Sequence, residues 1–237
     1  MQLKSSIWAT ILFLIIYFFT GAASGTPDNL ADPGSPSFRP GQASTASKSN
    51  SLEGKVIVID PGHGGYNTGA VGASGRTFEK TNVLFIAKDL KNMLEKAGAK
   101  VIMTRDSDIS PEFGGMDQLE SRVAIANSAD ADIFVSIHND SNQDRTIVGT
   151  TTYYYGSGES RRLAESIQYH LVKQLGSRNH GTKIAPFHVL KSTRMPAILV
   201  EVGFISNYWE EKQLADPAYR YKASLGIFNG IKDYFTR

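Results

Sequence analysis

The sequence contains no cysteine, and this absence excludes several kinds of chemistry. Disulfide bonds, a thiolate nucleophile and cysteine ligands for a metal all require a thiol, so none of them is available to this chain. Without disulfides, the fold must obtain its stability from its core.

The sequence also lacks an excess of charge of either sign. Its 237 residues include 25 basic and 23 acidic side chains, for a net charge of +2, so the overall balance implies no polyanionic partner such as nucleic acid. Apolar residues make up 41% and charged residues 20%, which is ordinary for a globular protein. The length allows one large domain or two small ones.

The first residues have the pattern of a targeting segment. Lys4 is followed by an uncharged apolar run, residues 7–19, that is short for a membrane span, and then by small residues at 21–25. We therefore predict that residues 1–25 are a secretory signal peptide. The alternative is an uncleaved anchor that holds the chain to the membrane through residues 7–20. Both interpretations place the rest of the chain outside the cytoplasm, in the periplasm, the cell wall or the extracellular space.

The next segment, residues 26–51, is rich in Pro, Gly, Ser, Thr and Ala and has almost no large apolar side chain. Such a segment cannot bury enough apolar surface to fold, so it is predicted to be a disordered linker. The folded part is predicted to be a single catalytic domain over residues 52–237.

Strands and helices alternate along this domain. The predicted strands are residues 55–60, 100–104, 132–137, 150–155, 188–191 and 197–202, and the predicted helices are residues 82–97, 117–128, 159–175 and 219–234. This alternation predicts an α/β fold, with a mostly parallel twisted sheet of about six strands and helices on both faces.

Titratable side chains lie at the ends of three of these strands. His63 follows the first strand, between glycines, and His138 ends the third. Glu201 lies in the last apolar strand, where a carboxylate is costly unless it is paired, hydrogen-bonded or near a metal. Because ligands bind at the carboxyl ends of strands in open α/β sheets, we expect these groups to share one site.

Glu79 precedes the first helix, and its simplest role is an acid that complements the helix dipole. Together with His63, His138 and Glu201 it would place two imidazoles and two carboxylates at one edge of the sheet. Two histidines and one glutamate form a known catalytic zinc set that leaves one position open for water. The fourth group is then free to act as a base.

Four short motifs in this order resemble one enzyme family. They are Val58-Ile-Asp-Pro-Gly-His-Gly-Gly, Phe78-Glu-Lys, Ser136-Ile-His and Val200-Glu-Val-Gly-Phe-Ile-Ser-Asn. The ordered set resembles the zinc-dependent N-acetylmuramoyl-L-alanine amidases of bacterial cell walls (amidase type 3), over essentially all of residues 55–235. The resemblance implies that His63, Glu79 and His138 hold Zn²⁺ and that Glu201 is the catalytic acid/base. It also implies peptidoglycan as the substrate, and we expect a monomer.

The sequence departs from the family pattern in two places. Asn139 and Asp140 follow His138 where the family usually has a small residue and then Asn, and the Gly-containing stretch 111–117 is longer than is common. These differences concern substrate contacts rather than the metal set. Asp60 and Asp140 are candidates to accept the second N–H of the ligating histidines, although the favoured expectation for Asp60 is simply that it forms the turn.

Two other functions remain open at this point. A peptidoglycan endopeptidase could use the same zinc site, although such enzymes usually carry a His-Glu-x-x-His helix, which this sequence lacks. A non-catalytic wall-binding module is the second alternative, but it predicts loss of the base. His170, His180 and His188 are expected to have packing or surface roles, and a substrate contact by His180 or Lys183 is the less favoured expectation.

Overall fold

The computed structural model describes residues 51–156 and 158–237. The predicted signal peptide or anchor, and nearly all of the predicted linker, lie outside the described residues. The strands are β1 Val56–Pro61, β2 Lys100–Met103, β3 Ile133–Asp140, β4 Thr150–Tyr154, β5 Asn179–Ile184 and β6 Ala197–Phe204. The helices are α1 Glu79–Lys96, α2 Gln118–Ser128, α3 Gly158–Leu175, α4 His188–Lys191, α5 Tyr208–Ala215 and α6 Pro217–Thr236.

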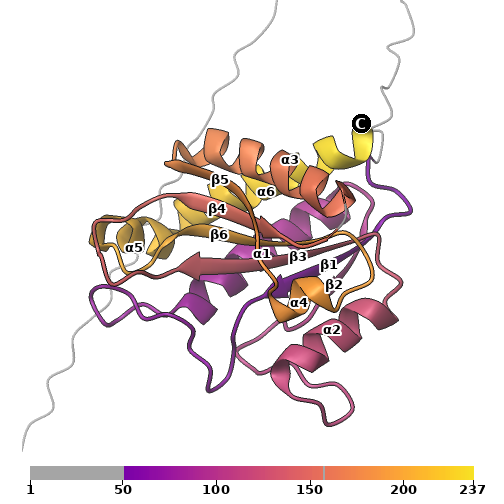
Figure 1. The fold of residues 1–237 in the computed structure, drawn as a ribbon, viewed down its shortest axis with the longest axis horizontal. Helices are drawn as coiled ribbons and strands as arrows, with labels where there is room; N and C mark the ends of the chain where they lie inside the picture. Colours follow the sequence, from indigo (N-terminus) through magenta and orange to yellow (C-terminus); the bar gives the residue numbers. More distant parts are fainter. Residues whose placement is uncertain (1–50, 157) are drawn as a thin grey trace, which may run out of the picture. The chain divides into compact units, whose positions relative to one another are not determined.

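The strands form one six-stranded sheet in the order β2-β1-β3-β6-β4-β5. Every neighbouring pair is parallel except β4 and β6, which run antiparallel. The prediction of a mostly parallel α/β sheet is therefore confirmed. The carboxyl ends of β1, β3 and β6, the three adjacent central strands, meet at one edge of the sheet (Figure 1).

Helices cover both faces of the sheet because the central strands are apolar on both sides. On one face the sheet packs against α1, α3 and α6 through a large buried cluster that includes Ile86, Leu90 and Ile167. On the other face α2 and α4 pack against a smaller cluster around Phe134. Figure 1 shows α2 and α4 on the opposite side of the sheet from α3 and α6.

Two parts of the predicted element order are wrong. Residues 188–191 form the short helix α4 rather than a strand, and its Val189 and Leu190 are buried in the smaller cluster. The outer strand is instead β5, Asn179–Ile184, whose residues are exposed or half-buried. Helix α5 was not predicted at all. Among the residues that the structure describes, no helix is long and apolar enough to span a membrane.

Candidate metal centre

The turn after β1 presents His63 in a strained conformation. The backbone N–H of Gly62 donates to the carbonyl of Ile137 on β3 at 3.0 Å, which extends the sheet by one residue. His63 follows with φ of 61°, in the left-handed region that non-glycine residues rarely adopt. Such a conformation persists only where surrounding contacts hold it, and it is common at functional sites.

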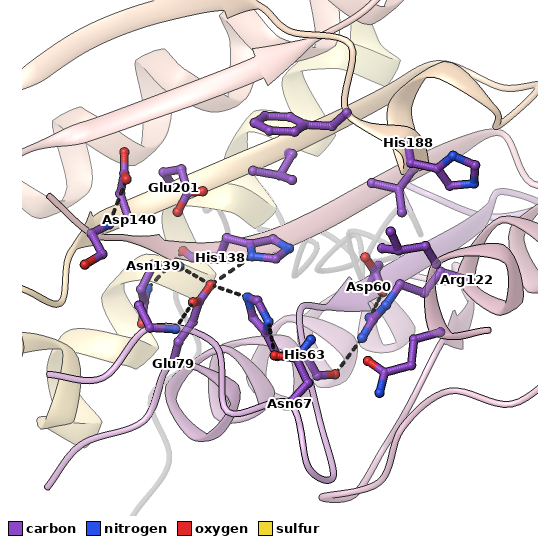
Figure 2. A pocket seen from close by; sticks show the side chains of 17 residues that line it. Asp60, His63, Asn67, Glu79, Arg122, His138, Asn139, Asp140, His188 and Glu201 are labelled. Carbon is purple, nitrogen blue, oxygen red and sulfur yellow. Dashed lines mark hydrogen bonds and ion pairs between the residues drawn. The ribbon is translucent and has the colours of Figure 1, made fainter. Parts of the chain in front are cut away.

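Glu79 lies between the two histidines. Its Oε1 is 3.1 Å from Nε2 of His63 and 2.8 Å from Nδ1 of His138, and the two imidazole rings are 4.9 Å apart at 78°. Figure 2 shows the three side chains pointing toward one another, from the turn after β1, from the start of α1 and from β3. Glu79 is the first residue of α1, but its carboxylate points to the two histidines. It therefore does more than complement the helix dipole.

Backbone groups fix the orientation of this carboxylate. Oε2 of Glu79 accepts from the N–H of Ala70 at 2.8 Å, and Oε1 accepts from the N–H of Asn139 at 3.0 Å. Burial alone would raise the pKa of Glu79, but hydrogen bonds to His138 and His63 lower it well below its ordinary value. Glu79 is therefore a carboxylate at neutral pH, the form that can bind a cation.

The residues present fit a metal ion. His63, Glu79 and His138 each offer one donor atom in a close group, and Oε1 of Glu79 lies 3.1 and 2.8 Å from a nitrogen of each histidine. Donor atoms on one Zn²⁺ are separated by up to about 4 Å, because each bond is about 2 Å. Two glycines leave the space that these side chains occupy. A Cβ at Gly62 would lie 2.5 Å from Nε2 of His138, and one at Gly69 would lie 2.5 Å from Oε2 of Glu79.

Glu201 lies on β6 directly beside His138, its partner in the β3–β6 register, and opposite Thr151 of β4. Its Oε2 is buried and has no hydrogen-bond partner among the described residues. Burial raises the pKa of Glu201 well above its ordinary value, and repulsion by the carboxylates of Glu79 and Asp140 raises it further. A buried carboxylate oxygen without a partner is costly, so its presence points to a chemical role.

Asn67, which was not predicted, orients His63. Its Oδ1 lies 2.9 Å from Nδ1 of His63 and also accepts from the N–H of Gly69 at 3.1 Å. Because an amide oxygen only accepts, Nδ1 donates to Asn67. Nε2 faces the carboxylate of Glu79 at 3.1 Å and is the nitrogen that would bind a metal after giving up its proton. For His63, Asn67 thus accepts the second N–H, the role for which Asp60 and Asp140 were candidates.

Asp60 instead belongs to a buried ionic cluster. It accepts from the hydroxyls of Thr104 and Ser136, each at 2.6 Å, and from the guanidinium of Arg122. Burial alone would raise the pKa of Asp60, but Arg122 and the two hydroxyls hold it below its usual range. The residue is a charged structural anchor beneath the site and not only a turn former.

Two buried arginines hold the strained turn in place. Arg122 donates to the carbonyls of Pro61 and His63 at 2.9 and 2.6 Å, and Arg105 donates to those of Pro61 and Gly62 at 3.0 and 2.7 Å. The sequence carried one signal of this arrangement, since Arg122 interrupts the inward face of α2 beside a buried valine. These four bonds form a clamp, made by Arg105 and Arg122, which explains how His63 maintains its positive φ.

We expect the substitution Arg122→Met to lower the free energy of unfolding by about 3–5 kcal/mol, because it leaves the buried charge of Asp60 without its partner. Urea denaturation of the unmodified and substituted chains measures this change. The matched control is Arg161→Met on α3, which removes an exposed ion pair with Glu165 and should change stability little. Equal effects of the two substitutions would contradict the structural role of the clamp.

The four predicted site residues line a single cleft of about 440 Å³ (Figure 2). Its walls also include Arg122, Asn139, Asp140 and Phe187, among other residues. His188 lines the cleft as well, and its Nε2 lies 2.9 Å from a carboxylate oxygen of Glu120.

Neither of the other two histidines lines this cleft, although His180 interacts electrostatically with Asp140, which does. His170 pairs with Asp233 at 3.4 Å, and Nε2 of His180 lies 2.8 Å from the carbonyl of Val148. The surface or packing roles expected for both stay predictions.

Comparison with known proteins gives one consistent match. Residues 57–233 match the N-acetylmuramoyl-L-alanine amidase family. The amidase LytC of Bacillus subtilis is 39% identical over 78% of this chain, which spans only 36% of LytC. The catalytic domain of CwlV, an N-acetylmuramoyl-L-alanine amidase from Bacillus (Paenibacillus) polymyxa var. colistinus, superposes with a TM-score of 0.72, at 36% identity over 77% of this chain and 98% of that domain.

The CwlD amidase from Clostridioides difficile, solved in complex with the GerS lipoprotein, superposes with a TM-score of 0.73, at 31% identity over 77% of this chain and 98% of that chain. These matches confirm the family resemblance inferred from the four motifs and the fold inferred from the strand and helix pattern. The chain belongs to the N-acetylmuramoyl-L-alanine amidase family.

Proposed function

We propose that this chain hydrolyses the amide bond between the lactyl group of N-acetylmuramic acid and L-alanine in peptidoglycan. One observation carries the proposal: Glu201, with its buried and unpartnered Oε2, shares a cleft with the convergent His63, Glu79 and His138 (Figure 2). A wall-binding module would not need to retain a costly carboxyl group there.

In this proposal His63, Glu79 and His138 hold Zn²⁺ through two imidazole nitrogens and one carboxylate oxygen. When bound, the ion lowers the pKa of a water molecule and polarises the carbonyl of the substrate. Asn67 fixes the orientation of His63, and the N–H groups of Ala70 and Asn139 fix that of Glu79, so these two donors are preorganised for a metal.

Glu201 serves as the general base and then as the general acid. Its carboxylate accepts a proton from the attacking water, and the resulting carboxylic acid donates that proton to the amide nitrogen of L-alanine as the C–N bond breaks. An amine leaves poorly unless it is protonated, so one group must perform both steps. The raised pKa of Glu201 suits both steps, since it favours holding the proton between them.

We expect digestion of purified peptidoglycan by the zinc-loaded chain to release new L-alanine amino termini while the glycan strands stay intact. Labelling of amino termini followed by chromatography identifies them, and the Glu201→Gln chain serves as the inactive control. New D-amino-acid termini would identify an endopeptidase instead. New reducing sugar ends would identify a glycosidase, and binding without any cleavage would identify a wall-binding module.

We further propose that residues 1–25 direct export or anchor the chain and that residues 26–51 tether the catalytic domain, residues 52–237. The support is the uncharged apolar run at 7–19, the small residues after it and the polar composition of 26–51. The proposed substrate lies outside the cytoplasm, which agrees with an exported chain acting in the periplasm, cell wall or medium. We propose that the chain acts as a monomer.

A further inference from the structure

Two large aromatic side chains stand exposed at the start of α5. Tyr208 is 51% and Trp209 is 70% accessible to solvent, and their rings pack edge to face with centroids 5.5 Å apart. Neighbouring exposed aromatic rings of this kind add little to the stability of the fold, because they are not removed from water. Exposed apolar patches with a polar rim are typical of binding sites.

The backbone that carries this pair is firmly held. Oδ1 of Asn207 caps α5 by accepting from the N–H groups of Trp209 and Glu210, at 3.0 and 3.1 Å. Glu210 is buried, and its carboxylate accepts from the N–H of Gly149 at 2.9 Å and from that of Phe204 at 2.6 Å. The backbone beneath the aromatic pair is therefore held in place, and a ligand would not have to order it.

Beside the rings the surface is hollowed. The hollow is lined by Tyr208, Trp209, Asn207, Arg145, Thr146 and Val148, together with Ala73. Two cations border it: the exposed guanidinium of Arg145, and the ammonium of Lys212, which lies 4.3 Å from the Tyr208 ring centroid and 5.2 Å from that of Trp209.

This combination of groups matches an amino-sugar polymer that carries carboxylates. The C–H faces of pyranose rings pack on aromatic rings, while acetamido oxygens and carboxylates accept hydrogen bonds from cations. The hollow offers both kinds of contact: the rings of Tyr208 and Trp209, and the cations of Arg145 and Lys212.

The hollow is joined to the metal cleft by a short, pinned loop. Asp140 and Ser141 line the cleft, and Arg145 and Thr146 line the hollow, so only three residues, 142–144, separate the two linings. The loop is tied to the segment before α5, because the N–H of Ile205 donates to the carbonyl of Asp140 at 2.8 Å.

Further bonds tie the same two segments together. The N–H of Asn142 donates to the hydroxyl of Ser206 at 2.9 Å, and the side chain of Asn207 donates to the carbonyl of Arg145 at 2.7 Å. Figure 1 shows α5 beyond the carboxyl ends of β3 and β6, the sheet edge at which the cleft lies.

From this geometry we propose that Tyr208, Trp209 and Arg145 form a binding subsite for the glycan strand of peptidoglycan, next to the cleft. The proposal rests on the proposed function, in which the cleaved bond belongs to one sugar of a long polymer. The sugars on either side of that bond must leave the cleft over neighbouring surface, and the Asp140–Arg145 loop leads directly to the aromatic pair. The subsite would hold the strand while the stem peptide lies in the cleft.

The test measures binding rather than turnover. The ligand is a soluble glycan strand of N-acetylglucosamine and N-acetylmuramic acid, freed of its peptides. Its affinity is measured for the Glu201→Gln chain, in which cleavage is not expected. Trp209→Ala should weaken this binding roughly tenfold, as expected for loss of one aromatic anchor. Trp209→Phe should keep most of the affinity, since it keeps an aromatic face.

The matched control is Tyr169→Ala on α3, which removes another exposed tyrosine, 57% accessible and 5.8 Å from the ammonium of Lys173. It should leave glycan affinity unchanged, and thermal unfolding of each variant confirms that it is folded. Unchanged affinity of Trp209→Ala, or an equal loss with Tyr169→Ala, would overturn the proposal. A loss of affinity for free stem peptide or for anionic lipid vesicles, but not for glycan, would also overturn it and assign the surface to that ligand.

Because the assay requires no cleavage, its outcome is independent of whether digestion yields L-alanine termini. If the unmodified chain cleaved no peptidoglycan while glycan binding still depended on Trp209, the proposed amidase activity would be refuted and the subsite would stand. If cleavage yielded L-alanine termini while glycan affinity did not depend on Trp209, the subsite would be refuted and the amidase activity would stand.

Discussion

Replacing Glu201 by glutamine should lower turnover on peptidoglycan by about 10²–10⁴-fold while the zinc content stays at the level of the unmodified chain. Glutamine keeps the shape of the side chain but can neither accept the proton of the attacking water nor return it to the leaving amine. The three expected metal donors are untouched, so an effect confined to turnover would separate acid–base chemistry from metal binding.

The same substitution carries a second expectation that activity alone would not reveal. Oε2 of Glu201 is buried without a partner, and Glu79 and Asp140 disfavour its negative charge. Removing that charge should therefore leave the free energy of unfolding unchanged or raise it. Turnover and urea denaturation of the same preparation measure both quantities.

A matched control for this substitution is Glu165→Gln on α3, whose carboxylate pairs with Arg161 on the surface. It should change neither turnover nor zinc content. Near-normal turnover of the Glu201→Gln chain with the metal retained would remove Glu201 from the mechanism. Marked destabilisation would show that the carboxylate has a structural partner.

The convergence of His63 and His138 could be predicted from the sequence because it depends on how strands end. Buried runs such as 56–60 and 133–137 are readable as apolar β-branched segments, and the parallel pairing of their strands brings His63 and His138 to one edge. The convergence of Glu79 with these histidines did not follow from a strand end. Glu79 was placed at this edge only as the acid before the first helix, where a local role would suffice, and its assignment as the metal ligand came from the family resemblance.

The errors have equally physical causes. Strand β5 reads Asn-His-Gly-Thr-Lys-Ile, and its exposed edge position leaves no apolar alternation to detect. Helix α4 is a single turn, too short to display a helical period, so its buried Val189 and Leu190 resemble a strand fragment. The bonds of Asn67 to His63 and of Arg122 to Asp60 were missed because they are tertiary contacts that local patterns do not encode.

Replacing His63 by alanine should abolish both stable zinc binding and turnover. In the proposed site one of three protein donors is lost, and even outer-shell substitutions typically cost 10–100-fold in metal affinity, so the loss of a donor should exceed that range. Metal analysis after dialysis should show zinc near one ion per unmodified chain and near zero per His63→Ala chain. Calorimetric titration with zinc gives the affinity independently of activity.

A second variant separates the metal ligand from the strained turn. Because His63 has a positive φ, His63→Ala retains an unfavourable backbone conformation while losing the bond to Asn67, and the turn could change shape. His138 lies within strand β3, so His138→Ala removes a donor without that complication, and it should lose zinc to a similar degree. The matched control is His170→Ala, a histidine paired with Asp233 on the α3–α6 side, which should keep its zinc.

The position of Glu79 makes these expectations strict. Its Oε1 lies about 3 Å from a nitrogen of each histidine, so the three groups form one cluster and removal of either ring opens it. If both alanine variants kept one zinc ion per chain, the ion would have to be held by other side chains, and the assignment of the metal to this cluster would be wrong. If only His63→Ala lost zinc, His138 would instead act as a hydrogen-bond partner of Glu79, and the proposed donor set would have to change.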